Sequence, residues 1–219
     1  MYPRTQSDLP AGQHYLLLAD ISGYTAFLAG VEQAHGVDFS AGIPAGYSIL
    51  GALLDAVVEG VQPAFDVAKL EGDAVFAVTP GDTLDGRGES VLSQLQAVYQ
   101  AFAARQAEAR QASDHICTAC PTVASLDLKM VLHRGQVVRQ TVGLQTELLG
   151  PAVNVAHRLL KNTVRARFGY RAYLFLTDAA ASGLSLSQVG LEHREDCPDV
   201  GPVQGRVLDL REQRVPLEG

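Results

Sequence analysis

Apolar and polar positions follow two different periods along the first half of the chain. Residues 15–19 form an uninterrupted apolar run, which is typical of a strand buried on both faces. From Ser22 onward the apolar residues recur at helical spacing instead. The pattern up to residue 80 predicts, in order, a strand at 15–19, a helix from 22, a helix at about 47–61, and strands at about 64–70 and 74–79.

The second half of the chain continues with a long helix and a further set of strands. A helix is expected to open at Gly150-Pro151, because proline is well suited to the first helical position. Its predicted buried stripe is Val153, Ala156, Leu160 and Val164. The other predicted elements are a helix at about 91–111, two strands around a turn at His133-Arg134-Gly135, a strand at 173–176, a short helix from Asp178, and strands near 189–192 and 206–210.

This order of elements predicts an α+β fold. Strand, helices, hairpin, helix and strand follow one another as in the ferredoxin-like βαββαβ core, with β additions at the C-terminus. In such a sheet the first strand lies antiparallel to the second arm of the hairpin, so we expect Asp20 and Asp73 to converge. We take residues 1–219 as one domain, with a core at about 14–178 and a C-terminal extension at about 179–219.

Composition and charge limit the classes of partner and the compartment. No apolar run approaches the length of a membrane span, and the N-terminus lacks the pattern of a signal peptide. Three cysteines without a secretory signal indicate a reducing compartment, so we expect a cytoplasmic protein. A formal net charge of −7 repels nucleic acid and anionic lipid, and we expect neither as a partner.

The predicted convergence of Asp20 and Asp73 indicates a metal site. Two carboxylates without a basic partner would repel each other unless a hard cation lay between them. Mg²⁺ or Mn²⁺ suits this arrangement because it keeps open positions for phosphate oxygens. The helix expected from Ser22, with Ser22 and Thr25 as cap and first-turn residues, would also direct backbone N–H groups at a bound phosphate.

Four stretches of the sequence resemble the catalytic domain of the class III adenylate and guanylate cyclases. They are LLLADISGYTAFLA, KLEGDAVFAV, LKMVLHRGQVV and ELLGPAVNVAHRLL. They occur in the family's order and span most of the chain, from about residue 15 to residue 160. The combination resembles a divergent bacterial branch of that family.

The resemblance implies a role for each matching position. Two metal ions per site would be bound at Asp20, Ile21 and Asp73, and Lys69 and Glu147 would contact the purine edge. The substrate phosphates would lie against Ser22, Gly23, Tyr24 and Thr25. Asn154 and Arg158 would orient the ribose and stabilise the transition state; four residues apart on one predicted helix, they share a face.

The same resemblance implies an activity and an assembly. Lys69 can donate to adenine N1 and Glu147 can accept from the 6-amino group, which favours ATP over GTP as the substrate and cyclic AMP as the product. Family members share each site across a homodimer. The segment between RGQVV and ELLG is shorter than the family's dimer arm, so we expect this arm to be missing.

Two histidines near these positions have different interpretations. His133 precedes the expected turn, and we interpret it as a half-buried structural residue. His157 stands where the family usually has a small residue, and the sequence assigns it no role.

The loop HICTAC offers a separate metal hypothesis. His115, Cys117 and Cys120 have ligand-like spacing, and Cys197 or His193 would complete a tetrahedral zinc site. A reduced, solvated cysteine pair and a reversible disulfide are the alternatives.

Three functions remain open at the level of the sequence. The first is a homodimeric, metal-dependent nucleotide cyclase, and the second is a nucleotide-binding signalling module that has lost efficient turnover. The third is a different metal-dependent nucleotidyl transfer on the same scaffold.

Overall fold

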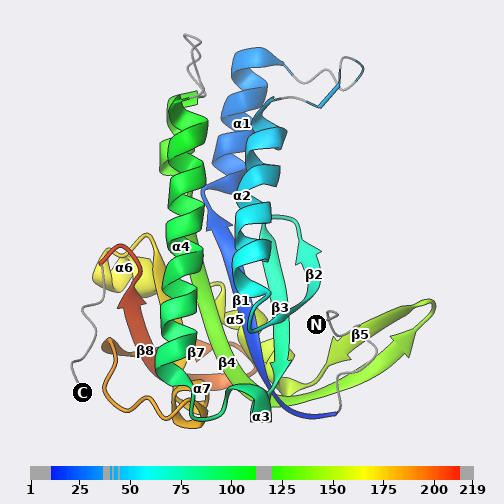
Figure 1. Cartoon of the computed structure of the whole chain (residues 1–219), viewed down its shortest axis with the longest axis vertical. Helices are drawn as coiled ribbons and strands as arrows, with labels where there is room; N and C mark the ends of the chain where they lie inside the picture. Colours follow the sequence, from blue (N-terminus) through cyan, green and yellow to red (C-terminus); the bar gives the residue numbers. More distant parts are fainter. Residues whose placement is uncertain (1–10, 37–39, 41, 44, 112–119, 213–219) are drawn as a thin grey trace.

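A mixed β-sheet runs through the centre of the molecule, in the strand order β2-β3-β1-β4-β6-β8-β7, with β5 paired to β4 (Figure 1). The computed structural model describes residues 11–36, 40, 42–43, 45–111 and 120–212. The strands are β1 (Gly12–Ser22), β2 (Asp66–Glu71), β3 (Ala74–Pro80), β4 (Asp127–Val142), β5 (Gln145–Leu149), β6 (Tyr173–Thr177), β7 (Leu191–Cys197) and β8 (Gly201–Asp209).

The helices cover both faces of this sheet. They are α1 (Tyr24–His35), α2 (Ala45–Val61), α3 (Gly81–Leu84), α4 (Gly88–Gln111), α5 (Pro151–Leu159), α6 (Val164–Phe168) and α7 (Asp178–Gly183), with a 3₁₀ helix η3 (Cys120–Ser125). Figure 1 shows α1, α2 and α4 side by side along one face, with α5 and α6 behind the sheet. Among the described residues, no helix is both long and apolar enough to cross a membrane.

The central strand β1 is apolar on both sides because each side meets a separate core. Leu17 and Ala19 belong to the cluster under α1, α2 and α4, whereas Leu16 and Leu18 belong to the cluster under α5 and α6. Successive side chains of a strand point to opposite faces, so the uninterrupted run follows directly from this double cover. The next even-numbered residue, Asp20, therefore faces the side of α5.

The ferredoxin-like core predicted from the order of elements is confirmed. β1 pairs antiparallel with β3, and β4 pairs antiparallel with the other side of β1. β7 and β8 extend the sheet beyond β6, as the predicted C-terminal additions require. The short helix expected from Asp178 is α7.

The predicted turn at His133-Arg134-Gly135 is wrong. β4 is one continuous strand that pairs with β1 through all three residues. Gly135 is instead explained by packing, because a Cβ built on it would lie 2.7 Å from the Cβ of Ala152 in α5. A glycine here lets the helix approach the sheet closely.

The helix predicted to run through Val164 is interrupted. α5 ends at Leu159, and Val164 begins the separate helix α6. Of the predicted stripe, Ala156 and Val164 are buried, but Ala152 and Leu159 are buried in place of Val153 and Leu160, which are only partly buried.

The expectation of a missing arm is also wrong. Beyond the core sheet, β4 continues into a hairpin with β5, joined at Gly143, which has φ +63°. Figure 1 shows this hairpin projecting away from the body of the molecule. Residues 138–149 are called the arm below. Val138, Val142, Leu144 and Leu149 of the arm are exposed apolar side chains.

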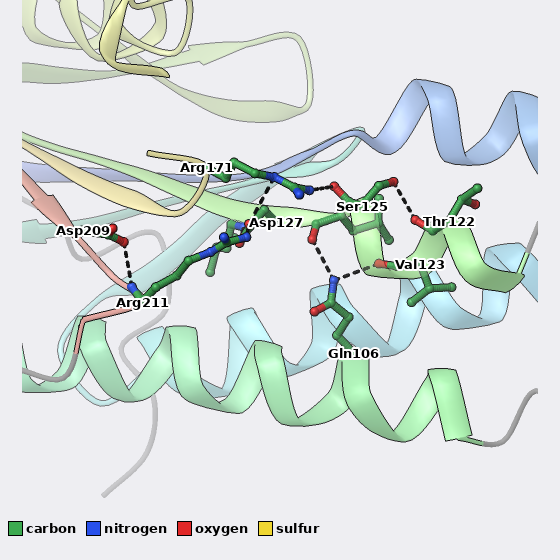
Figure 2. Close-up of polar contacts among 10 residues, drawn as sticks. Gln106, Thr122, Val123, Ser125, Asp127, Arg171, Asp209 and Arg211 are labelled. Atoms are coloured by element: carbon green, nitrogen blue, oxygen red, sulfur yellow. Dashed lines mark hydrogen bonds and ion pairs between the residues drawn. The ribbon is translucent and has the colours of Figure 1, made fainter. Parts of the chain in front are cut away.

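A polar cluster fixes the opposite end of β4. Asp127 is buried, accepts a hydrogen bond from Arg211, and lies 3.8 Å from Nε of Arg171 (Figure 2). Arg171 also donates to the carbonyl oxygen of Ser125 at 2.6 Å. A buried carboxylate needs such partners to keep its charge. Since Asp127 pairs with Ser22, this cluster also fixes the end of β1 that carries Asp20.

Candidate functional site

The ends of β1 and β3 bring the two predicted metal-binding aspartates together. Asp20 lies opposite Ala74, and the backbone N–H of Ile21 donates to the carbonyl oxygen of Asp73 at 3.1 Å. Gly72 has φ +65° and occupies the first central position of the two-residue turn between β2 and β3, where a positive φ favours glycine. The convergence expected from the order of strands is therefore present.

The two carboxylates have different surroundings. Oδ2 of Asp20 lies 3.1 Å from Nζ of Lys129, and the same ammonium donates to the carbonyl oxygen of Leu160 at 3.1 Å. Burial raises the pKa of Asp73, and the nearby charge of Asp20 raises it further. Asp20 thus has a cationic partner, whereas the negative charge on Asp73 is poorly compensated.

The segment after Asp20 is shaped by a glycine. β1 ends at Ser22 and α1 begins at Tyr24, with Gly23 as the N-cap at φ +90°. Among the described residues no side chain caps this helix, and the N-cap position is taken by Gly23, so the prediction of Ser22 as its cap is wrong. A Cβ on Gly23 would lie 3.1 Å from the carbonyl oxygen of Ser125. The uncapped first turn, including Thr25, leaves its backbone N–H groups for a ligand such as phosphate.

The two predicted purine-contacting residues lie next to each other. Nζ of Lys69 is 3.4 Å from Oε2 of Glu147, and 2.9 Å from Oε1 of Glu71. The hydrogen bond with Glu71 is the main reason that the pKa of Lys69 is raised. The β2–β3 register shifts between Val67 and Lys69, which places Lys69 opposite Phe76. Such irregularities often redirect a side chain beside a functional site.

Helix α5 carries the two predicted catalytic residues. Asn154 and Arg158 line a cavity of about 740 Å³, together with Asp20, Lys129, His157 and Asp199. Arg158 lies 3.4 Å from Asp199, which stands in the turn between β7 and β8. The cavity therefore joins residues from four segments that are far apart in the sequence: β1, β4, α5 with the residues just after it, and the turn between β7 and β8.

Sequence reasoning missed three contributors to this site. Lys129 holds Asp20, Glu71 holds Lys69, and His157 lies 3.4 Å from Glu71 with its ring against Phe76. His157 stands next to Arg158, and this placement within the ELLGPAVNVAHRLL block was the available signal. Lys129 lies in LKMVLHRGQVV, two residues after the start of β4 at Asp127.

The donor set at Asp20 and Asp73 fits Mg²⁺ or Mn²⁺. Both ions prefer oxygen ligands, and two carboxylates with the backbone of Ile21 supply them. Burial and the charge of Asp20 raise the pKa of Asp73 by disfavouring its ionised form, and a bound cation would favour that form. Within the described residues, no three His, Cys, Asp or Glu side chains form a cluster able to hold a metal, so the remaining ligands would come from substrate and water.

The zinc hypothesis stays a prediction. His115 and Cys117 lie outside the described residues, and η3 begins at Cys120. Cys197 is a buried free thiol in the cluster under α5, on the face of the sheet opposite the one that η3 helps to cover. His193 is hydrogen-bonded to Glu195. His133 is half-buried beside Thr177, as its structural interpretation requires.

Solved structures similar to this chain include nucleotide cyclases. The adenylyl cyclase CyaB from P. aeruginosa has a TM-score of 0.62 at 14% identity, covering 92% of this chain and 97% of that one. The guanylyl cyclase Cya2 has a TM-score of 0.60 at 10% identity, with 90% and 91% covered. For a bacterial light-regulated adenylyl cyclase the TM-score is 0.58 at 14% identity, covering 93% of this chain and 53% of that one. The chain thus spans about half the length of that enzyme.

At these identities the likeness shows the fold, which is that of class III cyclase catalytic domains. Two closer matches come from sequence. The uncharacterized protein Rv2561/Rv2562 of Mycobacterium tuberculosis (strain ATCC 25618 / H37Rv) is 30% identical over 169 residues, 76% of each chain. Residues 50–168 match the model of the family described as Protein of unknown function (DUF2652). The chain therefore belongs to that family and has a cyclase-like fold.

Proposed function

We propose that this protein is a metal-dependent purine nucleotide cyclase that converts ATP into 3′,5′-cyclic AMP and pyrophosphate. One observation carries the proposal: a single cavity joins a strand-end carboxylate, Asp20, to Asn154 and Arg158 of α5. Beside it, Lys69 and Glu147 lie 3.4 Å apart, where together they can donate to and accept from an adenine edge.

The proposed chemistry assigns a task to each group. The ribose O3′ bonds to the α-phosphorus, the bond to the β-phosphate oxygen breaks, pyrophosphate leaves, and the 3′-hydroxyl proton passes to solvent. Arg158 stabilises the charge that develops on the α-phosphate, and Asn154 orients the ribose. Asp20 and Asp73 would hold Mg²⁺ or Mn²⁺, which would supply activation of the 3′-oxygen and neutralisation of the triphosphate charge.

The proposal includes a homodimer in which two copies of the chain complete each site. Its support is the arm, whose exposed apolar side chains would be covered by a second copy. The cyclase-like fold is compatible with either ATP or GTP, and the Lys69–Glu147 pair is what favours ATP.

The first test is product formation. The purified protein should yield cyclic AMP from ATP with Mn²⁺ or Mg²⁺, measured by mass spectrometry, with GTP as the parallel substrate. Asp20→Ala should lower the rate at least about 100-fold, because the stabilisation supplied by a bound metal amounts to several kcal/mol. Asp55→Asn, an exposed carboxylate on α2, is the matched control and should leave the rate unchanged.

A second candidate is a nucleotide-binding module without efficient turnover. Two ion pairs favour it, because Asp20 already binds Lys129 and Arg158 already contacts Asp199 within one chain. Metal-dependent ATP binding without any cyclic product would support this module and contradict the cyclase. A product other than a cyclic nucleotide would instead indicate a different nucleotidyl transfer.

A further inference from the structure

Four charged or polar side chains form a continuous chain of contacts beside the cavity. Oε2 of Glu71 lies 3.4 Å from Nδ1 of His157, and Oε1 of the same carboxylate lies 2.9 Å from Nζ of Lys69. That ammonium lies 3.4 Å from Glu147. The contacts thus run from α5 through β2 to β5, with Glu71 bridging a histidine and a lysine.

The Phe76 ring lies under both ends of this bridge. The His157 ring meets Phe76 edge-on, with 5.3 Å between ring centroids, and Nζ of Lys69 lies 6.0 Å from the centroid of the same ring. Each of the four linked side chains is about 30–42% exposed, so the network is half-buried. The aromatic ring on the other side limits where Lys69 and His157 can move.

We propose that His157 and Glu71 are positioning residues for purine recognition. His157 fixes one oxygen of Glu71, and the other oxygen then holds Lys69 at the place from which it faces Glu147. The inference rests on the proposed function, because it assigns Lys69 and Glu147 to the adenine edge. It adds a physical link between the helix that carries Asn154 and Arg158 and the pair that selects the base.

A lysine has a long and flexible side chain, so its placement has a large effect on selectivity. Without a fixed partner, Lys69 would exchange between Glu71, Glu147 and water. Adenine would then meet a donor that is not held in place. Part of the binding energy would be used to order the Lys69 side chain, so ATP would bind more weakly. Guanine presents its acceptor and donor in the reverse order from adenine, so a Lys69–Glu147 pair that is held in place for adenine does not match it. GTP binding therefore gains little when Lys69 is held in place.

The experiment compares ATP and GTP dissociation constants for the full chain, measured with Mn²⁺ by isothermal titration calorimetry. His157→Ala and Glu71→Gln should each weaken ATP binding by about 3–10-fold. GTP binding should change less than about twofold, so that the preference for ATP falls. His157→Asn keeps an N–H donor near the place of Nδ1 and should restore ATP binding to within about twofold of the unaltered protein.

Glu108→Gln provides the matched control. It breaks an exposed 2.9 Å ion pair with Arg105 on α4, on the other face of the sheet, and should leave both dissociation constants unchanged. Melting temperatures of all variants show whether each is folded.

The possible outcomes separate this inference from the proposed function. If the unaltered protein binds neither nucleotide, or prefers GTP, the proposed adenine recognition fails and this inference fails with it. If it prefers ATP and His157→Ala keeps that preference, only the role of His157 is overturned. An equal loss of ATP and GTP binding would show a merely structural role and would also overturn the inference.

Discussion

At the scale of single residues, the site is electrostatically asymmetric. Asp20 is paired with Lys129, whereas the pKa of Asp73 is raised, first by burial and then by the charge of Asp20. Removing the charge of Asp73 and removing the charge of Asp20 should therefore change the stability of the metal-free protein in opposite directions. Lys129 is only 20% exposed, so the loss of Asp20 leaves a poorly solvated ammonium without its carboxylate.

The first prediction at this scale concerns stability with and without metal. Asp73→Asn should raise the melting temperature of the metal-free protein by up to about 2 °C, because it removes a repulsive charge. Asp20→Asn should lower it. Both variants should lose the rise in melting temperature that Mn²⁺ gives the unaltered protein, measured by differential scanning calorimetry without nucleotide. A full Mn²⁺ response in Asp73→Asn would show that the ion binds elsewhere.

The sequence predicted some of these residue contacts and not others. Asp20 and Asp73 could be placed together because strand pairing in a βαββαβ core fixes which ends meet. Lys69 and Glu147 could be paired through a family resemblance. The bridges made by Lys129 and His157 depend on how α5 lies over the sheet and on individual rotamers, and no pattern of apolar residues encodes those.

At the scale of elements, β4 shows how a glycine can mislead. His133-Arg134-Gly135 has the composition of a turn, yet the strand continues through it because α5 needs the space above Gly135. The arm was missed for a separate reason, because the segment between RGQVV and ELLG is shorter than the dimer arm of the family. The true turn, at Gly143, lies eight residues further along the chain.

The arm gives the prediction at this scale. Leu144 at its tip is fully exposed, and Val142 is exposed beside it. Leu144→Asp should convert a dimer into a monomer in sedimentation-velocity experiments and should lower cyclase activity with it, because a charge cannot be buried unpaired in an interface. Leu191→Asp, an exposed apolar residue on the edge strand β7, is the control and should remain a dimer. Unchanged sedimentation of Leu144→Asp would remove the arm from the interface.

At the scale of the whole molecule, the two faces of the sheet have different tasks. The face under α1, α2 and α4 contributes the larger apolar core, whereas the face under α5 and α6 also carries the cavity. The order of elements was enough to predict the core of the sheet, because the βαββαβ order fixes which strands lie next to each other. Where α5 ends could not be predicted, since Leu160 and Val164 continue an apolar spacing across the break between α5 and α6.

The folded molecule should also lose stability in mild acid. Burial lowers the pKa of His133 to about 4, whereas an unfolded histidine binds a proton near pH 6.5. Between these values the unfolded chain binds more protons, so the free energy of unfolding falls as the pH is lowered, by at most about 1.4 kcal/mol per pH unit.

Urea titrations at pH 7, 6, 5 and 4.5 measure this slope. His133→Asn keeps a polar partner for Thr177 and should flatten it. A slope that is unchanged in His133→Asn would assign the acid sensitivity to another group. Burial raises the pKa of Glu195, but hydrogen bonds from Thr163 and His193 lower it below the usual glutamate value. Its contribution to the slope has the same sign and begins only near that usual value, and His133→Asn leaves it in place.

The length of β4 has a mechanical consequence. A single hydrogen-bonded ribbon runs from Asp127, clamped by Arg171 and Arg211, past Lys129 and out to the tip of the arm. The one glycine between the clamp and the point where the arm leaves the body, Gly135, stays paired with His14 of β1. If a second protomer displaced the arm, the displacement would be transmitted along β4 to its fixed end beside Lys129. Dimer formation through the arm would in that way change the geometry around Asp20, which is paired with Lys129.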